Sequence, residues 1–414
     1  MHHTDHSEFQ VDNASILFLA RMFPYHNNSF RFTMTMREEV CPETLQKAVD
    51  RIWKRFPSVI AGFQPGFFRF RQVPASMPPQ VQPDPGLLAT FRKEERSKCC
   101  FRVYYQGRDI SLELFHALTD GSGTITTFTT LVAEYLSLRY GLVTPVSQLR
   151  LDVSEGPQPH ELADSFLDNA GAKPRSLCNR YAYQIPRGPD ADWQVRISPL
   201  TMDAKLLLNA AHKYEVTLNT LLTSILACSV MEYQKQRKTR LKPVRIMVPV
   251  DLRRQFGSRT LRNFTLYALP TLEAADHDRP LKEICGSIAR QLEQQLSRES
   301  LAGMISYNVR TQNSPLFRCI PWAVKSAAMR LGYRFFGEVN SSLTLTNLGR
   351  VQLPEEFRAY VENFQANLTP RTGSPYACTV LTYGSNVTIK ISKFCENTEL
   401  EEIFFRNLKA VVAQ

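Results

Sequence analysis

The sequence lacks the long apolar run that a membrane-spanning helix requires. Its longest mainly apolar run, from 220 to 231, carries hydroxyl groups and is well short of the roughly 18 apolar residues of a span. The first residues have neither the basic region nor the apolar stretch of a secretory signal. We therefore expect a cytoplasmic protein with no membrane span.

The sequence also lacks the cysteine spacing of a zinc site or a disulfide framework. Its nine cysteines are an odd number, and no two of them form a C-x-x-C pair. Because most of them have apolar neighbours, we expect reduced, buried thiols. We expect no bound metal and no tightly bound cofactor.

Motifs of several enzyme classes are missing as well. The sequence contains no G-x-S-x-G, no G-x-x-x-x-G-K-[ST] and no H-E-x-x-H, which argues against hydrolase, nucleoside triphosphatase and zinc-protease functions. The net charge of +11 is compatible with an anionic partner or simply with a basic surface. Since the basic residues fall into small separate groups that match no recognition module, we expect no nucleic-acid partner.

What is present is the pattern of a large folded protein. The 414 residues, 43% hydrophobic and 21% charged, suffice for one large or two ordinary domains. Alternating apolar residues predict a strand at 29–36, and helical periodicity predicts a helix from Pro42 to Phe56. Two further strands are predicted at 99–105 and 110–115 around a Gly-containing turn, followed by a helix at 125–141.

The second half of the chain also mixes strands and helices. Thr201 and Thr217 are expected to cap two helices, and residues 281–301 and those from Leu400 onward are expected to form two more. Predicted strands lie at 193–197, 244–250, 264–272, 343–346, 376–382 and 386–392. Residues 64–86 and 149–192 are rich in turn-forming residues and are expected to be irregular.

This order of elements predicts an α/β protein with largely mixed sheets. We place an N-terminal lobe at 1–160, a crossover linker at 161–192 and a C-terminal lobe at 193–414.

One of the eight histidines, His116, stands at the C-terminal end of a predicted strand and just before a helix. Ligands of α/β proteins bind at such strand ends. An imidazole there can take a proton from an alcohol or amine if a hydrogen bond to its other nitrogen fixes the tautomer. A structural histidine is the alternative, and Asp120, Gly121 and Gly123 are equally explained as a helix N-cap and turn residues.

The segment LFHALTDGSG at 114–123 resembles the H-x-x-x-D-G signature of the CoA-dependent acyltransferase superfamily. This group includes chloramphenicol acetyltransferase, alcohol acetyltransferases and the condensation domains of peptide synthetases. Three later stretches resemble family motifs in order and spacing: VPVDLRR at 248–254, LRNF at 261–264 and TNLG at 346–349. The resemblance covers nearly the whole chain and implies two chloramphenicol acetyltransferase-like lobes with an active-site channel between them.

Details of the motif favour one branch of the superfamily. Phe115 replaces the first histidine of the double-histidine signature, which tilts the resemblance toward alcohol acetyltransferases and away from condensation domains and wax ester synthases. No D-F-G-W-G is present, which argues against a plant-type enzyme.

The resemblance implies roles for individual residues. His116 would be the general base, and Asp120, next to Gly121, would pair with an arginine to hold the loop. Arg253 is the candidate arginine, with a solvated charge as the alternative; Asn263 would support the inter-lobe strand or merely begin it. Ser122, Thr346 and Asn347 are candidate donors to an oxyanion.

The implied activity is direct transfer of an acyl group, in the first instance acetyl, from CoA to a hydroxyl acceptor. The expected partners are acyl-CoA as co-substrate and a small-molecule acceptor. Two alternatives stay open: a stand-alone condensation-type enzyme that takes its acyl group from an acyl carrier protein, and a non-catalytic binding protein with the same fold.

Overall fold

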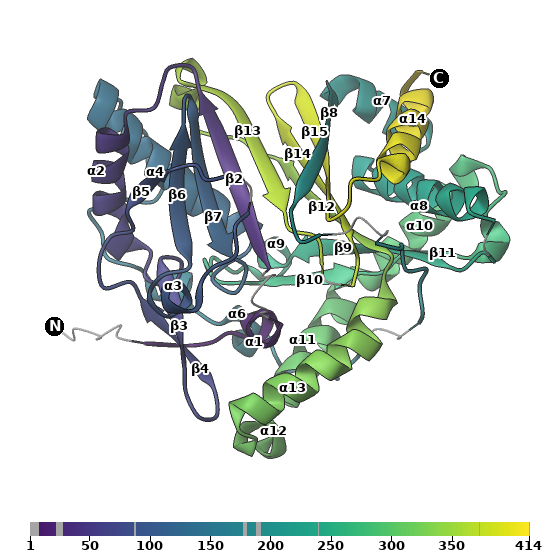
Figure 1. Cartoon of the computed structure of the whole chain (residues 1–414), viewed down its shortest axis with the longest axis horizontal. Helices are drawn as coiled ribbons and strands as arrows, with labels where there is room; N and C mark the ends of the chain where they lie inside the picture. Colours follow the sequence, from purple (N-terminus) through teal and green to yellow (C-terminus); the bar gives the residue numbers. More distant parts are fainter. Residues whose placement is uncertain are drawn as a thin grey trace.

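Two large β-sheets, each covered by helices on its outer face, form the framework of the protein (Figure 1). The computed structural model describes residues 8–21, 28–86, 88–176, 180–187, 192–238, 240–371 and 373–413. The mixed α/β class and the two-lobed arrangement predicted from the sequence are confirmed.

The N-terminal sheet has five strands in the order β13-β2-β7-β6-β5. Their bounds are Ser29–Met36 for β2, Val81–Pro83 for β5, Phe101–Gln106 for β6, Asp109–Phe115 for β7 and Val361–Leu368 for β13. Helices α2 (Pro42–Ile52) and α4 (Gly121–Tyr140) pack on its outer face (Figure 1). The predicted apolar face of β2 is confirmed, because all four of its alternating Phe and Met side chains are buried.

The C-terminal sheet runs in the order β10-β9-β12-β14-β15-β8, with β11 paired to β9. Its strands are β8 (Arg196–Asp203), β9 (Val244–Asp251), β10 (Thr265–Ala268), β11 (Thr271–Leu272), β12 (Leu343–Arg350), β14 (Tyr376–Tyr383) and β15 (Asn386–Lys393). The outer helices are α7 (Ala204–Lys213), α8 (Leu218–Gln236), α10 (Leu281–Gln295) and α14 (Glu399–Ala413). The sheet is mixed because β12 is parallel to both β9 and β14, whereas the other pairings are antiparallel.

Shorter elements fill the space below and between the sheets. A small sheet joins β1 (Phe9–Gln10), β4 (Phe70–Pro74) and β3 (Ala61–Pro65). The remaining α-helices are α1 (Asn13–Ala20), α3 (Lys93–Lys98), α5 (Pro159–Leu162), α6 (Ser165–Asp168), α9 (Arg253–Phe256), α11 (Arg298–Asn313), α12 (Pro315–Cys319) and α13 (Trp322–Gly332). A π-helical turn, η3 (Tyr333–Gly337), continues α13.

Strand β13 links the two halves of the chain. It comes from the C-terminal half in sequence but pairs with β2 along its length, with Phe364 opposite Met34. The sequence patterns did not identify this strand, because Glu362, Asn363 and Gln365 interrupt its apolar residues. The boundaries at 160 and 192 stay a prediction, to which the structure adds this crossing strand.

Some local expectations were wrong. Residues 64–86 contain the end of β3 and all of β4 and β5, held by backbone pairing that composition does not reveal. Thr201 lies inside β8 opposite Thr388, and α7 is instead capped by Asp203, whose carboxylate accepts from the N–H groups of Lys205 and Leu206. Thr217 does cap α8, as predicted.

Two longer elements are divided in the structure. The helix predicted at 281–301 is two helices, because Ser297 caps the start of α11. The strand predicted at 264–272 is interrupted at Pro270, which has no N–H to donate to a neighbouring strand, and forms β10 and β11.

The cysteines follow their predicted burial only in part. Four are buried: Cys100, Cys285, Cys378 and Cys395. Cys319 is exposed, and Cys178 lies outside the described residues. No disulfide bond joins any two of the eight described cysteines.

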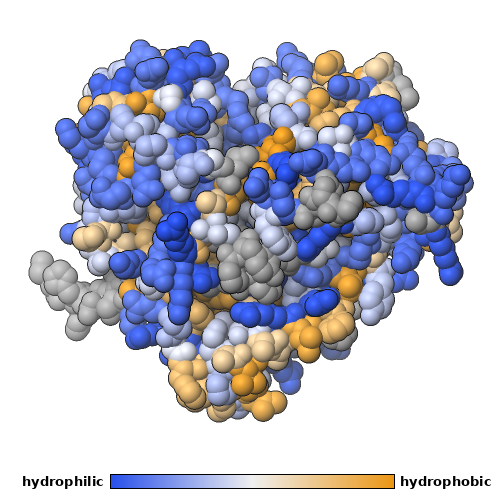
Figure 2. All heavy atoms as spheres, viewed as in Figure 1, coloured by the Kyte–Doolittle hydropathy of each residue, from blue (hydrophilic) through white to orange (hydrophobic). Residues whose placement is uncertain are grey.

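Within the described ranges, no single helix has the length and apolar composition needed to cross a membrane. Helices α7 and α8 meet that test only as a pair bent by 80°, and α8 is a core helix of the C-terminal half. The surface shows apolar side chains over α12 and α13, including Leu316, Val324 and Leu331 (Figure 2).

Gly123 lies at a close contact between the two halves. A Cβ atom at this position would lie 2.2 Å from Thr119 Oγ1 and 2.3 Å from the carbonyl oxygen of Leu261. We predict that Gly123→Ala lowers the unfolding free energy by about 1–3 kcal/mol, because the overlap forces the backbones apart. Chemical denaturation measures this change.

Gly286→Ala is the matched control, because Gly286 lies in α10 with no atom within 4 Å of its added Cβ. This variant should gain up to about 1 kcal/mol from helix propensity. Equal unfolding free energies of the two variants would contradict the close contact at Gly123.

Candidate active site

His116 follows directly after β7, where the N-terminal sheet meets the C-terminal half. Its backbone N–H donates to the carbonyl oxygen of Asn28 at 2.8 Å, which continues the β2–β7 pairing by one residue. Phe18, from α1, stacks on the imidazole with ring centroids 4.4 Å apart and planes inclined by 16°. Phe30 meets it edge-on at 4.9 Å. The two aromatic rings fix the orientation of the imidazole.

The surroundings of His116 favour a neutral imidazole. Burial lowers the pKa of His116 below its usual value of 6.5 and outweighs the opposing influence of its own backbone, Asp120 and Asn263. Its Nδ1 atom is buried and has no hydrogen-bond partner among the described residues. Within the described residues, the packing of Phe18 and Phe30 holds the ring.

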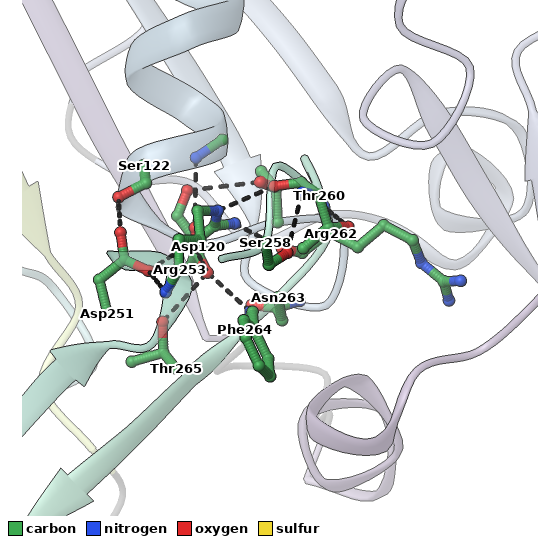
Figure 3. Close-up of polar contacts among 12 residues, drawn as sticks. Asp120, Ser122, Asp251, Arg253, Ser258, Thr260, Arg262, Asn263, Phe264 and Thr265 are labelled. Carbon is green, nitrogen blue, oxygen red and sulfur yellow. Dashed lines mark hydrogen bonds and ion pairs between the residues drawn. The ribbon is translucent and has the colours of Figure 1, made fainter. Parts of the chain in front are cut away.

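Asp120 connects α4 to the C-terminal sheet (Figure 3). One carboxylate oxygen caps α4 by accepting from the N–H of Gly123 at 3.2 Å. The other accepts from the N–H of Phe264 at 2.8 Å and from the hydroxyl of Thr265 at 3.0 Å. The same oxygen accepts from Nη1 of Arg253 at 2.9 Å.

Burial alone would raise the pKa of Asp120, but the charge of Arg253 and the hydrogen bonds to the carboxylate lower it below its usual value. Asp120 is therefore an ionised structural group at neutral pH.

Arg253 is the partner of Asp120 and lies at the start of α9. Its Nε donates to the carbonyl oxygen of Thr260 at 2.8 Å, and its Nη2 donates to that of Arg262 at 2.7 Å. Its Nη1 also donates to Asp251 at 2.9 Å, and Asp251 in turn accepts from the hydroxyl of Ser122 at 2.5 Å (Figure 3). The structure thus brings the predicted Asp120 and Arg253 into direct contact.

Asn263 holds the loop after His116 from a second side. Its amide donates to the carbonyl oxygen of Ala117 and to the hydroxyl of Ser15, both at 3.3 Å. Ser15 also donates to Ala117 at 2.5 Å and is held by Asp12, the N-cap of α1. These contacts place α1, and with it Phe18, against the imidazole.

Sequence patterns did not identify Phe18 and Ser15 as part of the site. Asp12 followed by a short apolar run is a recognisable helix start, but nothing local shows that the helix packs on a residue a hundred positions later. Gly121, which the motif includes, faces Leu348: its added Cβ would lie 2.8 Å from Cδ2 of that side chain.

A cavity of about 370 Å³ opens next to His116 between the two halves. Both sheets contribute to its wall, which includes Ser122, Thr346 and Asn347, the three candidate oxyanion donors. A larger hollow of about 980 Å³ lies between α7, α8 and α10. Since its lining lacks the aromatic packing and interlocked charges found around His116, we assign the site to the smaller cavity.

Among the described residues, no group of three or more His, Cys, Asp or Glu side chains is arranged to hold a metal ion.

Comparison with known proteins places this geometry in a fold family. No family model and no curated sequence matches the chain. Solved structures do match over almost its full length. Polyketide synthase associated protein 5 from Mycobacterium tuberculosis is 13% identical, with a TM-score of 0.63 over 98% of each chain. The fold is that of the CoA-dependent acyltransferases and condensation domains.

Two further matching structures are an acetyltransferase and a condensation domain. The trichothecene 15-O-acetyltransferase from Fusarium sporotrichioides is 10% identical, with a TM-score of 0.61 over 97% of this chain and 94% of its own. The first condensation domain of the calcium-dependent antibiotic synthetase is 11% identical, with a TM-score of 0.62 over 99% and 96%. At these identities the likeness establishes the acyltransferase and condensation fold.

Arg253 is the residue whose removal tests the charge network. We predict that Arg253→Met lowers the unfolding free energy by about 3–5 kcal/mol, because Asp120 is left as a buried carboxylate without its counter-charge. Thermal and denaturant unfolding measure the loss.

Arg254→Met is the matched control, since the neighbouring Arg254 is exposed. It should change stability by no more than about 0.5 kcal/mol. If Arg253→Met loses no more unfolding free energy than this control, the ion pair does not stabilise the protein.

Proposed function

We propose that the protein transfers an acyl group, with acetyl as the simplest case, from a CoA thioester to a hydroxyl acceptor, and that His116 acts as the general base. The observation that carries this proposal is the position of His116. Its imidazole is clamped between two aromatic rings at the wall of a cavity between the two halves, and its pKa is lowered. These are the properties of a proton acceptor that is neutral at physiological pH.

The geometry of the imidazole indicates which nitrogen reacts. Since Nδ1 is buried, Nε2 is the nitrogen that a substrate in the cavity can reach. Nε2 removes the hydroxyl proton of the acceptor as the oxygen attacks the thioester carbonyl carbon. The tetrahedral intermediate then collapses, the carbon–sulfur bond breaks, and the proton passes from the imidazolium to the departing thiolate.

The negative charge on the intermediate requires hydrogen-bond donors. Ser122, Thr346 and Asn347 line the cavity and are the candidates. The hydroxyl of Ser122 already donates to Asp251, which leaves Thr346 and Asn347 as the better placed pair. Asp120 and Arg253 act as positioning residues, because they interact with each other and with backbone rather than with a reacting atom.

The main alternative function differs from this proposal in the identity of the acyl donor. Condensation domains share this fold, so an acyl carrier protein is the second candidate for the donor. We favour a hydroxyl acceptor and a free thioester, because the motif carries Phe115 where the double-histidine signature has its first histidine. Phe115 is buried and packs edge-on against Phe63 at 5.8 Å, which gives this position a packing role.

Replacement of His116 tests the proposed base. We predict that His116→Ala lowers kcat/KM for acceptor-dependent thiol release from acetyl-CoA by about 10²–10⁴-fold, because proton transfer is lost. The assay compares acetyl-CoA and longer acyl-CoAs against a panel of alcohols and amines. Circular dichroism verifies that the variant folds.

His212→Ala is the control, because His212 is exposed on α7. It should keep full activity. If His116→Ala releases thiol as fast as the natural protein, His116 is not the general base. If the protein uses an acyl group bound to an acyl carrier protein but none of the acyl-CoAs, the condensation-type enzyme is favoured.

The pH dependence of activity provides a second test of the proposed base. Because burial lowers the pKa of His116, the neutral base form persists to lower pH than for a free histidine. We predict that the acid limb of the pH profile of kcat/KM has its midpoint below pH 6.5. A midpoint at or above 6.5 would show that another group controls activity or that the imidazole is solvated.

A further inference from the structure

Two arginines lie in the wall of the cavity that contains His116. Arg21 ends α1, and Arg371 lies in the connection between β13 and β14; both side chains line the cavity. The two guanidinium groups meet at one side chain, Tyr333 of η3. The guanidinium carbon of Arg21 lies 3.7 Å above the tyrosine ring, and Nη1 of Arg371 donates to its hydroxyl at 3.3 Å.

The two arginines differ in their ion pairs. Arg21 is 4% exposed, and its Nη2 lies 3.9 Å from Glu338. Arg371 donates to the hydroxyl of Ser341 at 2.7 Å and has no carboxylate partner among the described residues. Within the described residues, the guanidinium of Arg371 is therefore hydrogen-bonded to hydroxyl groups while it lines the cavity.

The charges of these neighbouring groups also affect one another's pKa. Burial lowers the pKa of Arg21, and the charge of Arg371 lowers it further. Burial would raise the pKa of Tyr333, but the two arginines lower it below its usual value. In addition, Nε of Arg371 is buried and has no hydrogen-bond partner among the described residues. A buried guanidinium with an unused donor is costly unless a ligand satisfies it.

We propose that Arg371, with Arg21, binds a carboxylate of the substrate, so that the cavity accepts an acidic acceptor or an acidic acyl group. A carboxylate can accept two parallel hydrogen bonds from a guanidinium, and Arg371 lines the cavity with no carboxylate partner among the described residues. This inference rests on the proposed function, because it names the substrate class of the same site.

Both arginines lie in the same cavity as His116. Arg21 follows three residues after Phe18, which stacks on the imidazole. Substrate pairs that differ by one carboxylate, and titration with succinate in the absence of CoA, distinguish a substrate carboxylate from the phosphates of CoA.

The test compares pairs of substrates that differ by the carboxylate. In the acceptor arm, 4-hydroxybutyrate is compared with 1-butanol, with acetyl-CoA as donor; in the donor arm, succinyl-CoA is compared with butyryl-CoA, with one alcohol as acceptor. We expect a preference for the acidic member in one arm. We expect Arg371→Met to raise its KM by about tenfold to a hundredfold and to leave the neutral member unchanged.

Two further variants keep the comparison interpretable. Arg371→Lys retains the charge and should keep part of the preference, even if the methionine variant folds poorly. Arg334→Met is the control, because Arg334 is exposed on the same turn as Tyr333. It should match the natural protein in both arms.

A binding measurement separates failure of this inference from failure of the proposed function. Succinate is titrated into the protein in the absence of acyl-CoA, so that no reaction occurs, and its binding is measured by calorimetry. Binding that disappears in Arg371→Met supports the carboxylate site even if no acyl transfer is found. Acyl transfer with neutral substrates, together with no succinate binding and equal KM values in Arg371→Met, would overturn the carboxylate site and leave the acyltransferase proposal standing.

Discussion

The buried ion pair between Asp120 and Arg253 is the interaction on which the geometry of the site depends. A carboxylate removed from water is destabilising unless its oxygens are satisfied, and here they accept from the N–H groups of Gly123 and Phe264, the hydroxyl of Thr265 and the guanidinium. Arg253 is equally well satisfied, because backbone carbonyl oxygens occupy its other donors. The ion pair therefore holds α4 and β10 in a fixed position relative to each other.

Because the loop from His116 to Asp120 is short, the fixed position of Asp120 also restricts the imidazole. Only three residues separate the two, so a fixed Asp120 leaves the histidine little freedom. The loop is also held at Ala117 by Asn263 and at Thr119, whose hydroxyl donates to the carbonyl oxygen of Leu261 at 2.6 Å. The C-terminal half thus positions a residue of the N-terminal half, and the cavity between them forms as a consequence.

Aromatic packing contributes a second property, the neutrality of the imidazole. Phe18 and Phe30 exclude water from two sides of the ring, and the resulting desolvation disfavours its protonated form. The same burial makes the two arginines at Tyr333 a strong electrostatic feature, since charges in a water-poor cavity are poorly screened. A neutral imidazole and two arginines in one cavity support the proposed substrate, which has one acidic and one reacting group.

Much of this structure could be predicted from the sequence, because many elements have strong local patterns. The alternation in β2, the apolar face of α2 and the caps at Asp120 and Thr217 are local signals, and all were found. The resemblance of the H-x-x-x-D-G segment and the later VPVDLRR stretch also indicated that Asp120 and Arg253 would meet.

Other features depend on tertiary contacts that carry no local signal. Strand β13 has an interrupted pattern and gains its partner from the other half of the chain. Phe18 is an ordinary apolar residue of a short helix until α1 packs on His116, and Arg371 is one of many arginines until the fold places it beside Arg21. Long-range packing, rather than local propensity, determines these parts of the site.

A double-mutant cycle is the most direct measurement of the central ion pair. The free energy of unfolding is determined for the natural protein, Asp120→Asn, Arg253→Met and the double variant. We expect the double variant to be more stable than the sum of the single losses predicts, with a coupling of at least about 1 kcal/mol, because each single change leaves a buried partner unsatisfied. Losses that add to within about 0.5 kcal/mol would contradict the ion pair as the joint between the two halves.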